Sequence, residues 1–203
     1  MPTLVLASAS PRRRELLERL GLTFEIDPAD TDEHTGLGAK EAVALLSRRK
    51  AEVCAGRHPG QVVLAADTLV AIDNRPLGKP GTPEEACVML RALSGREHHV
   101  YTGVTVISAQ GDVFTGVDAS AVRFGTMTEE EISAYVATGE PMDKAGAYAL
   151  QGMAALYIEE VQGSPSGIIG LPLYLTRQLL GKAGVRCLPQ KQHRQPERLN
   201  TAR

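Results

Sequence analysis

The residues best suited to chemistry begin in a basic turn near the N-terminus, Ser8–Arg13. It follows the apolar run Leu4–Ala7, and Ser10 and Pro11 are typical of the cap and first position of a helix. A helix N-terminus offers unpaired backbone N–H groups and the positive end of the helix dipole, which suit a phosphate. Because that dipole disfavours cations, the run Arg12–Arg14 is unfavourable unless an anion is bound there. A plain capped helix leaves the arginines unexplained, so the pattern favours phosphate binding, although the sequence has no Walker loop.

A second candidate is Asp67, which follows the apolar run Gln61–Ala66 and precedes Thr68. A carboxylate at the end of a rigid, buried strand can bind a metal ion or orient a water molecule. An Asp-Thr pair can equally close a hydrogen-bonded turn. The residues alone leave both interpretations open.

Other polar residues could complete a site, although each has a plain structural explanation. Lys79 lies in the constrained turn Gly78–Pro80 and Lys50 lies on a predicted helix, and a lone lysine is usually solvated. Glu33 belongs to an acidic loop that could supply a carboxylate to a metal ion. Gln151, in a long glycine-punctuated loop, offers the donor and acceptor needed to read the edge of a nucleobase.

Two histidines and three cysteines favour structural roles. His98 and His99 directly precede a predicted strand, and adjacent residues in an extended chain point to opposite faces, so they should not easily chelate one ion together. The cysteines are far apart and form no C-x-x-C pair, so their spacing supports neither a zinc site nor a disulfide framework.

Composition limits the class of protein. With 203 residues and a formal charge of -2, the chain fits one globular domain without a general surface for polyanions, so nucleic acid is not an expected partner. The N-terminal apolar run is too short for a signal peptide, and no run approaches the roughly 18 apolar residues of a membrane span. The chain is expected to be cytoplasmic, with no membrane partner.

The elements that must position these residues alternate along the chain and predict an α/β fold with a mixed sheet. Capping boxes at 82–85 and 128–131 mark two helix starts. Ligands of such sheets bind at the carboxyl ends of strands, where the first turn and Asp67 are both expected. One domain should span 1–185, followed by a disordered polar tail, 186–203. Helices are predicted at 11–20, 39–56, 83–93, 129–138 and 171–180, and strands at 4–7, 24–27, 61–66, 69–72, 100–107, 113–124 and 156–161.

Taken in order, the motifs resemble those of the Maf family of nucleoside triphosphate pyrophosphatases. The resemblance covers the chain as far as about Val185 and implies a two-lobed fold related to inosine triphosphate pyrophosphatases, with a cleft between the lobes and a homodimeric assembly. It implies hydrolysis of a nucleoside triphosphate to the monophosphate and pyrophosphate with a divalent cation, Mg²⁺ or Mn²⁺. The matching segments are Leu6–Arg13, Ala66–Thr68, Gly78–Pro80, Ser94–Gly95, His98–Gly103, Gly139–Gly152 and Gly170–Leu173.

The resemblance also implies roles for individual residues. Asp67 would be catalytic and would hold the metal ion with Glu33. Substrate would be bound by Ser8, Arg12, Arg13, Lys50, Thr68, Lys79 and Gln151.

The form of Asp143–Tyr148 together with Gln151 resembles the branch acting on dTTP and UTP, and modified pyrimidine nucleotides are further candidate substrates. The biological role implied is clearance of nucleotide pools, with a link to arrest of cell division. The segment Gly163–Ile169 departs from the family pattern, which affects the expected shape of the cleft. Two other functions remain open, a phosphatase releasing single phosphates and a nucleotide-binding regulator without turnover.

Overall fold

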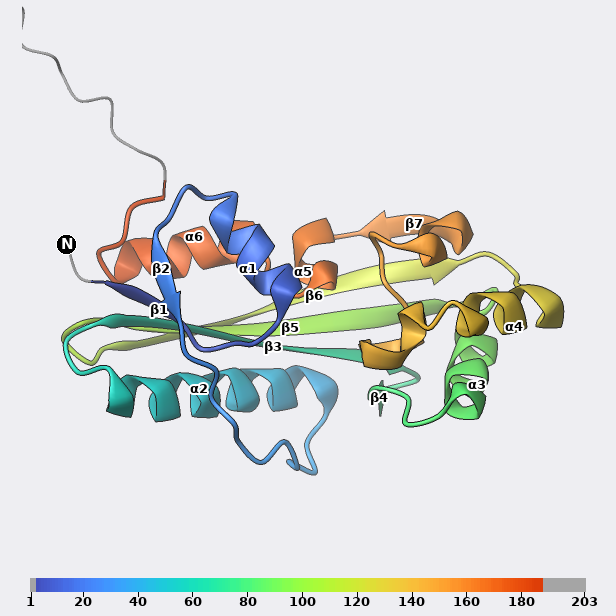
Figure 1. Ribbon diagram of the computed structural model, residues 1–203, viewed down its shortest axis with the longest axis horizontal. Helices are drawn as coiled ribbons and strands as arrows, with labels where there is room; N and C mark the ends of the chain where they lie inside the picture. The colour runs from blue at the N-terminus through green and yellow to red at the C-terminus, as the bar shows by residue number, and fades with distance from the viewer. Residues whose placement is uncertain (1–2, 188–203) are drawn as a thin grey trace, which may run out of the picture.

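A computed structural model describes residues 3–187 of the chain (Figure 1). Most of the predicted disordered tail, 188–203, lies outside the described residues. Within the described range, no helix is long and apolar enough to cross a membrane.

The framework is one mixed sheet of seven strands in the order β2-β1-β3-β5-β6-β7, with β4 paired to β3. The short strand β1 is parallel to β2 and β3, and the remaining pairs are antiparallel. This confirms the predicted α/β class with a mixed sheet. The strands are β1 Leu4–Leu6, β2 Phe24–Ile26, β3 Val62–Ile72, β4 Arg75–Leu77, β5 Glu97–Ile107, β6 Val113–Phe124 and β7 Ile158–Gln162.

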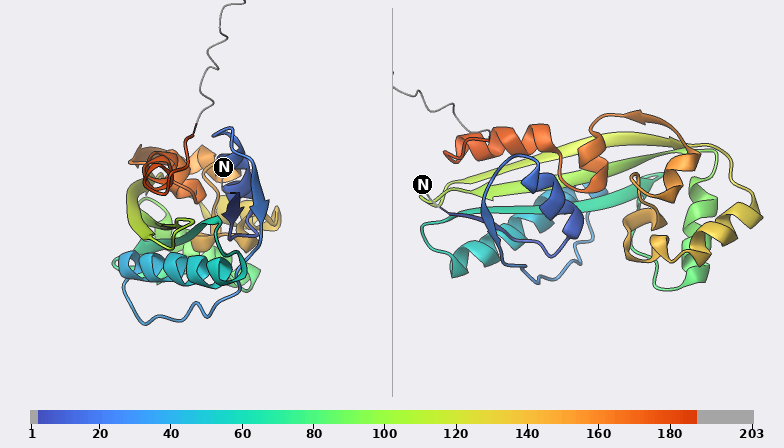
Figure 2. Two further views of the ribbon diagram at one scale, coloured as in Figure 1. Left: turned by 90° about the vertical axis from the view of Figure 1, so that its left-hand side faces the viewer. Right: turned by 45° about the horizontal axis from the view of Figure 1, so that its top comes forward.

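Helices cover both faces of the sheet. One face carries α2, the other carries α1 and α6, and α3 and α4 lie together at the far end of the long strands (Figures 1 and 2). The helices are α1 Pro11–Glu18, α2 Ala39–Arg57, α3 Pro83–Leu93, α4 Glu129–Ala137, α5 Pro165–Ile169 and α6 Leu173–Lys182, with 3-10 turns η1 Glu140–Asp143, η2 Ala145–Ala147 and η3 Met153–Tyr157.

Side-chain capping fixes where several helices begin. Ser10 accepts a hydrogen bond from the Arg13 backbone N–H, as expected of the cap of α1. The capping box at Thr128 is complete. The predicted box at Thr82 is only half formed, because the Glu85 side chain accepts from the backbone of Gly81. Both helices nevertheless begin where the sequence predicted.

The core alternates along β3. Val62, Leu64 and Ala66 pack in a cluster with residues of α1 and α6, whereas Val63 and Ala65 pack with Ala51 and Cys54 of α2. Successive side chains of a strand point to opposite faces of its sheet, and this alternation continues beyond the apolar run. Asp67 therefore faces α2, and Thr68 faces α1 and α5.

The prediction that the strand ends at Asp67 is wrong, because β3 runs unbroken from Val62 to Ile72. Asp67 and Thr68 pair with Gly103 and Thr102 of β5. The neighbour on the other side stops earlier, since Leu6 at the end of β1 pairs with Leu64. Between that point and Val70, where β4 begins to pair with β3, this edge of β3 has no neighbouring strand among the described residues, and polar side chains there reach a site without ending the strand. The basic turn therefore follows the end of a strand, β1, as predicted, whereas Asp67 lies in the interior of β3.

Three other boundaries differ from the predictions. His98 and His99 lie inside β5 instead of preceding it. The predicted strand 156–161 begins at Ile158, after η3. The last helix begins at Leu173, and the short α5 precedes it.

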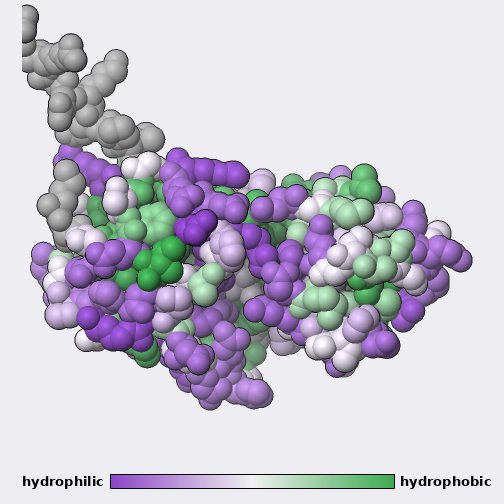
Figure 3. All heavy atoms as spheres, in the orientation of Figure 1, coloured by the Kyte–Doolittle hydropathy of each residue, from purple (hydrophilic) through white to green (hydrophobic). Residues whose placement is uncertain are grey.

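Long strands connect the two ends of the molecule. One lobe holds β1, β2, α1, α2 and α6, and the other holds α3, α4 and the 3-10 turns (Figure 1). A space-filling view shows the surface hollowed between these ends, with hydrophilic residues along the hollow (Figure 3). The two lobes and the cleft agree with the expected fold.

Candidate functional site

Arg13, in the first turn of α1, joins three parts of the chain. Its Nε donates to the carbonyl of Gly170 at 2.9 Å, Nη1 donates to Ser8 Oγ at 3.2 Å, and Nη2 donates to Thr68 Oγ1 at 3.2 Å. Thr68 Oγ1 also lies 2.9 Å from Thr102 Oγ1. Burial lowers the pKa of Arg13, while the Asp67 carboxylate acts in the opposite sense. A guanidinium stays protonated in proteins, so Arg13 is a fixed positive charge at the floor of the site.

On the opposite face of β3, Lys50 joins two carboxylates. Its Nζ donates to Asp67 Oδ1 at 2.6 Å and to Glu33 Oε1 at 2.8 Å. The hydrogen bond from Lys50 lowers the pKa of Glu33, so that carboxylate is ionised near neutral pH. Asp67 is buried and Glu33 is exposed.

The Lys50 ammonium lies between Glu33 and Asp67, where a metal ion held by the two carboxylates would lie. Two carboxylates converge on one cation within hydrogen-bonding distance, and carboxylate oxygens are the ligands that Mg²⁺ and Mn²⁺ prefer. The donor set at Glu33 and Asp67 therefore fits a divalent ion once Lys50 gives up its place between them.

Two cavities meet above these groups. The larger, about 520 Å³, is lined mainly by polar and charged residues, among them Ser8, Arg12, Arg13, Glu33 and Lys50. Asp67 lies beneath it and does not line it, since Lys50 covers the carboxylate. The smaller, about 140 Å³, extends toward the second lobe. Arg12, Arg13, Lys79 and Asp143 line both cavities, so the two form one continuous site.

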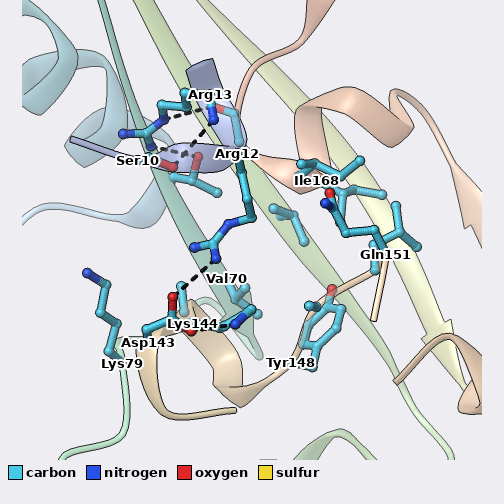
Figure 4. Close-up of a pocket in the computed structure, with 17 residues that line it drawn as sticks. Ser10, Arg12, Arg13, Val70, Lys79, Asp143, Lys144, Tyr148, Gln151 and Ile168 are labelled. Atoms are coloured by element: carbon cyan, nitrogen blue, oxygen red, sulfur yellow. Dashed lines mark hydrogen bonds and ion pairs between the residues drawn. The ribbon is translucent and has the colours of Figure 1, made fainter. Parts of the chain in front are cut away.

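The smaller cavity has apolar walls over part of its lining, and charged side chains such as Lys79 and Lys144 contribute much of the rest. Val70, Tyr148 and Ile168 contribute the walls, and Thr68 and the exposed side chain of Gln151 contribute polar atoms (Figure 4). A flat organic ring suits such walls, and sparse polar groups can read its edge.

Arg12 spans the two lobes. Its Nη1 lies 3.2 Å from Asp143 Oδ2, and Asp143 also pairs with Lys144 (Figure 4). Lys144 Nζ donates to the carbonyl of Glu140 at 2.8 Å. The pair between Arg12 and Asp143 closes the cavity mouth through an exposed contact, and an exposed ion pair is weak enough to open for an anion.

One side chain holds the loop that carries Gln151. The Glu140 carboxylate accepts from Tyr135 Oη at 2.7 Å and from the Met153 backbone N–H at 3.1 Å. Gly152 lies against it so closely that a Cβ there would be 2.2 Å from Glu140 Oε1. The two ends of the loop are thereby joined.

The sequence-derived site residues all lie at this site, on different elements. Ser8, Arg12 and Arg13 come from the first turn, Glu33 from the following loop and Lys50 from α2. Asp67 and Thr68 lie on opposite faces of β3, Lys79 follows β4, and Gln151 lies on the second lobe.

Asp143, Lys144, Thr102 and Glu140 were missed as members of the site. All four lie within segments that match the family, His98–Gly103 and Gly139–Gly152, but a match of a segment does not say which side chains reach the site. His98 has the structural role expected, buried between Phe124 and Tyr148 with Nε2 2.8 Å from Tyr148 Oη.

Comparison with known proteins agrees with this geometry. The family described as Maf-like protein matches residues 3–183. A dTTP/UTP pyrophosphatase of Geobacillus sp. (strain WCH70) is 47% identical over 186 residues, covering 91% of this chain and 100% of the relative. A dTTP/UTP pyrophosphatase of Anaeromyxobacter dehalogenans (strain 2CP-C) is 50% identical, covering 90% of this chain and 95% of the relative.

Among solved structures, a HAM1 protein from Coxiella burnetii aligns with a TM-score of 0.52 at 17% identity, covering 90% of this chain and 100% of that chain. At that identity the likeness concerns the fold alone. The family match extends over nearly all of the described residues and includes every element of the site. The chain belongs to the family of Maf-like proteins.

Proposed function

We propose that this protein hydrolyses dTTP and UTP to the nucleoside monophosphate and pyrophosphate. The observation that carries the proposal is the continuity of the larger, charged cavity with the smaller, partly apolar cavity across Arg12, Arg13 and Lys79. The relatives named dTTP/UTP pyrophosphatase support the choice of substrate.

The charged cavity is assigned to the triphosphate. A triphosphate carries about four negative charges, so its hydrolysis depends mainly on positioning and on charge neutralisation. Arg12, Arg13, Lys79 and the Ser8 hydroxyl bind the phosphate oxygens in this proposal. The N-terminus of α1 adds the backbone N–H of Arg12, because Pro11 has none and that of Arg13 is bound by the Ser10 cap.

The apolar cavity is assigned to the pyrimidine. Tyr148 and Ile168 contact the faces of the ring, and the Gln151 amide donates to and accepts from its edge. Arg12 and Arg13 line both cavities, and Thr68 is hydrogen-bonded to Arg13 on the side of the smaller one, so the sugar and the first phosphate are assigned to this junction.

Glu33 and Asp67 would hold the divalent ion, Mg²⁺ or Mn²⁺. When bound, the ion supplies charge neutralisation and a lowered pKa for coordinated water. Lys50 leaves Asp67 and moves toward the phosphates, whose charge replaces that of the carboxylates as its partner.

Asp67 then orients the attacking water and accepts its proton. The water oxygen forms a bond to the α-phosphorus, the bond from that phosphorus to the bridging oxygen breaks, and pyrophosphate leaves with the bonding electron pair. Asp67 suits this task because β3 continues before and after it in the chain, which fixes the position of its backbone.

Asp67→Asn tests the catalytic assignment. The change keeps the size of the side chain and removes its capacity to accept a proton, so turnover of dTTP should fall at least about a hundredfold. Pyrophosphate release measures the rate, and circular dichroism establishes that the variant is folded. A folded variant that hydrolyses dTTP at the normal rate would remove Asp67 from the mechanism.

Gln151→Glu tests the assignment of the base. Loss of the amide donor should change the relative kcat/KM values for dTTP, UTP and purine triphosphates, while leaving the phosphate contacts in place. An unchanged substrate profile contradicts the assignment.

A screen of nucleoside triphosphates with Mg²⁺ and with Mn²⁺ separates the remaining alternatives. Pyrophosphate as product supports the proposal, whereas orthophosphate indicates a phosphatase, and binding without turnover indicates a regulator. Including modified pyrimidine nucleotides identifies the preferred substrate. Homodimerisation, cytoplasmic location and a link to arrest of cell division stay predictions.

A further inference from the structure

A second group of metal-ligating side chains lies outside the two cavities, where α2 ends beside β2. The group contains a carboxylate, a thiol and an imidazole, from Asp27, Cys54 and His58, with one ligand atom of each lying within 4.8 Å of the others. Asp27 Oδ2 is 2.8 Å from His58 Nε2 and 4.0 Å from Cys54 Sγ.

The backbone fixes all three positions. Asp27 directly follows β2, and its N–H donates to the carbonyl of Leu6 in β1 at 3.1 Å. Cys54 and His58 are four residues apart at the carboxyl end of α2, a spacing that brings two side chains to the same face. Cys54 is fully buried, whereas the side chains of Asp27 and His58 are 31% and 19% exposed. The group therefore has a buried floor and a side open to solvent.

We propose that Asp27, Cys54 and His58 form a binding site for a thiophilic divalent cation, with Zn²⁺ as the best fit. Zinc prefers four ligands and takes thiolate sulfur, imidazole nitrogen and carboxylate oxygen at about 2.0–2.3 Å. In a tetrahedral arrangement those bond lengths place ligand atoms roughly 3.3–3.7 Å apart. The contacts of 2.8 and 4.0 Å bracket that range, so small side-chain rotations complete the site, and the open side admits a water as fourth ligand.

Arg57 is the cation that pairs with Asp27 in this structure. Its Nε donates to Asp27 Oδ2 at 2.8 Å, and its Nη2 donates to the carbonyl of Pro28 at 3.0 Å. A bound cation competes with Arg57 for Asp27. The Arg57 side chain is 43% exposed, so it can turn into solvent, and breaking such an exposed ion pair has a small free-energy cost.

The thiol distinguishes this site from the one proposed at Glu33 and Asp67. That pair offers oxygen atoms alone, which suit Mg²⁺ and Mn²⁺, whereas a thiolate selects softer cations. The two sites are linked by chain, because Pro28, Ala29 and Asp30 follow Asp27 directly and line the larger cavity. An ion at Asp27 anchors the start of the segment that leads to Glu33.

Titration with Co²⁺ tests the proposal on the full chain under reducing conditions. Cobalt bound to a thiolate gives an intense near-ultraviolet charge-transfer band, and cobalt bound only to oxygen gives none. We expect the band to saturate at one equivalent and to disappear when one equivalent of Zn²⁺ is added.

Substitutions assign the band to its ligands. Cys54→Ser should abolish it, and His58→Gln should weaken Co²⁺ binding at least tenfold, with circular dichroism reporting the fold of each variant. Cys87→Ser is the matched control, since Cys87 is a half-buried thiol on α3, and it should keep the band. Arg57→Gln removes the competing cation and should tighten Co²⁺ binding severalfold.

Absence of the band in the wild-type protein would overturn the proposal, as would its survival in Cys54→Ser or its loss in Cys87→Ser. Weaker Co²⁺ binding by Arg57→Gln would also contradict it, because Asp27 would then not be the residue for which the two cations compete. None of these outcomes depends on turnover of a nucleotide.

Discussion

Gly103 of β5 is the point where α2 packs closest to the sheet. A Cβ added there would lie 2.1 Å from the carbonyl oxygen of Val43 in α2. Carbon and carbonyl oxygen normally approach to about 3.3 Å, so Gly103→Ala should push this part of α2 away by about 1.2 Å. Gly103 pairs with Asp67 across the sheet, and Lys50 lies two turns of α2 beyond Val43, so the displacement reaches the site directly.

Two effects of known size follow. Overpacking a core typically lowers the free energy of unfolding by about 1–3 kcal/mol, which a domain of ordinary stability tolerates. A displacement of about 1 Å in a catalytic arrangement can lower the rate about a hundredfold. We therefore expect a Gly103→Ala variant that stays folded while its kcat/KM for dTTP falls about a hundredfold, as the 2.6 Å contact between Lys50 and Asp67 lengthens.

Urea unfolding and pyrophosphate release measure the two effects on the same preparation. Gly56→Ala is the control on the same helix, because a Cβ at Gly56 meets no atom within 4 Å. It should raise stability by roughly 0.5–1 kcal/mol without changing activity. Normal stability and normal activity of Gly103→Ala together would refute the close packing of α2 on β5.

Two further predictions concern pH and metal removal. Burial, with a smaller contribution from His99, lowers the pKa of His98 from 6.5 to about 4. Because the unfolded chain binds this proton near pH 6.5 and the folded chain only near pH 4, the free energy of unfolding should fall by about 1.4 kcal/mol for each unit by which the pH drops from 6.5 toward 4. Urea unfolding of wild type and His98→Gln checks this, and equal pH slopes would contradict it. Chelation by EDTA should abolish pyrophosphate release from dTTP while leaving the circular dichroism spectrum unchanged, and added Mg²⁺ should restore activity; full activity in EDTA would exclude a divalent ion from the reaction.

The sequence predicted the elements that have strong local signals. The long hairpin of β5 and β6 follows from Val- and Thr-rich segments around the turn at Gln110-Gly111. The start of α4 follows from the capping box at Thr128. By contrast α5 has five residues, too few to show a helical period, and only the cap at Ser164 marks it.

The site was predictable where one short segment contains it. The basic turn has a local physical reason, since arginines at a helix N-terminus call for an anion. The contact between Lys50 and Asp67 depends on how α2 is rotated on the sheet, and no local sequence pattern encodes that rotation. The group at Asp27, Cys54 and His58 was also not predicted. Sequence rules for zinc sites depend on closely spaced cysteines, whereas these ligands come from the end of α2 and from the residue after β2.

The alternation of β3 has a consequence for how such an enzyme can change. Asp67 and Thr68 are neighbours in the chain, yet the backbone of one strand separates the carboxylate that faces α2 from the hydroxyl that faces the apolar cavity. Mutations that reshape the cavity around Gln151 need not disturb the groups on the α2 face of the sheet, provided that Thr68 keeps its hydrogen bond with Arg13. Substrate preference can therefore diverge among descendants of one ancestor while the hydrolytic chemistry is inherited intact, and libraries aimed at new nucleotides should vary the upper face alone.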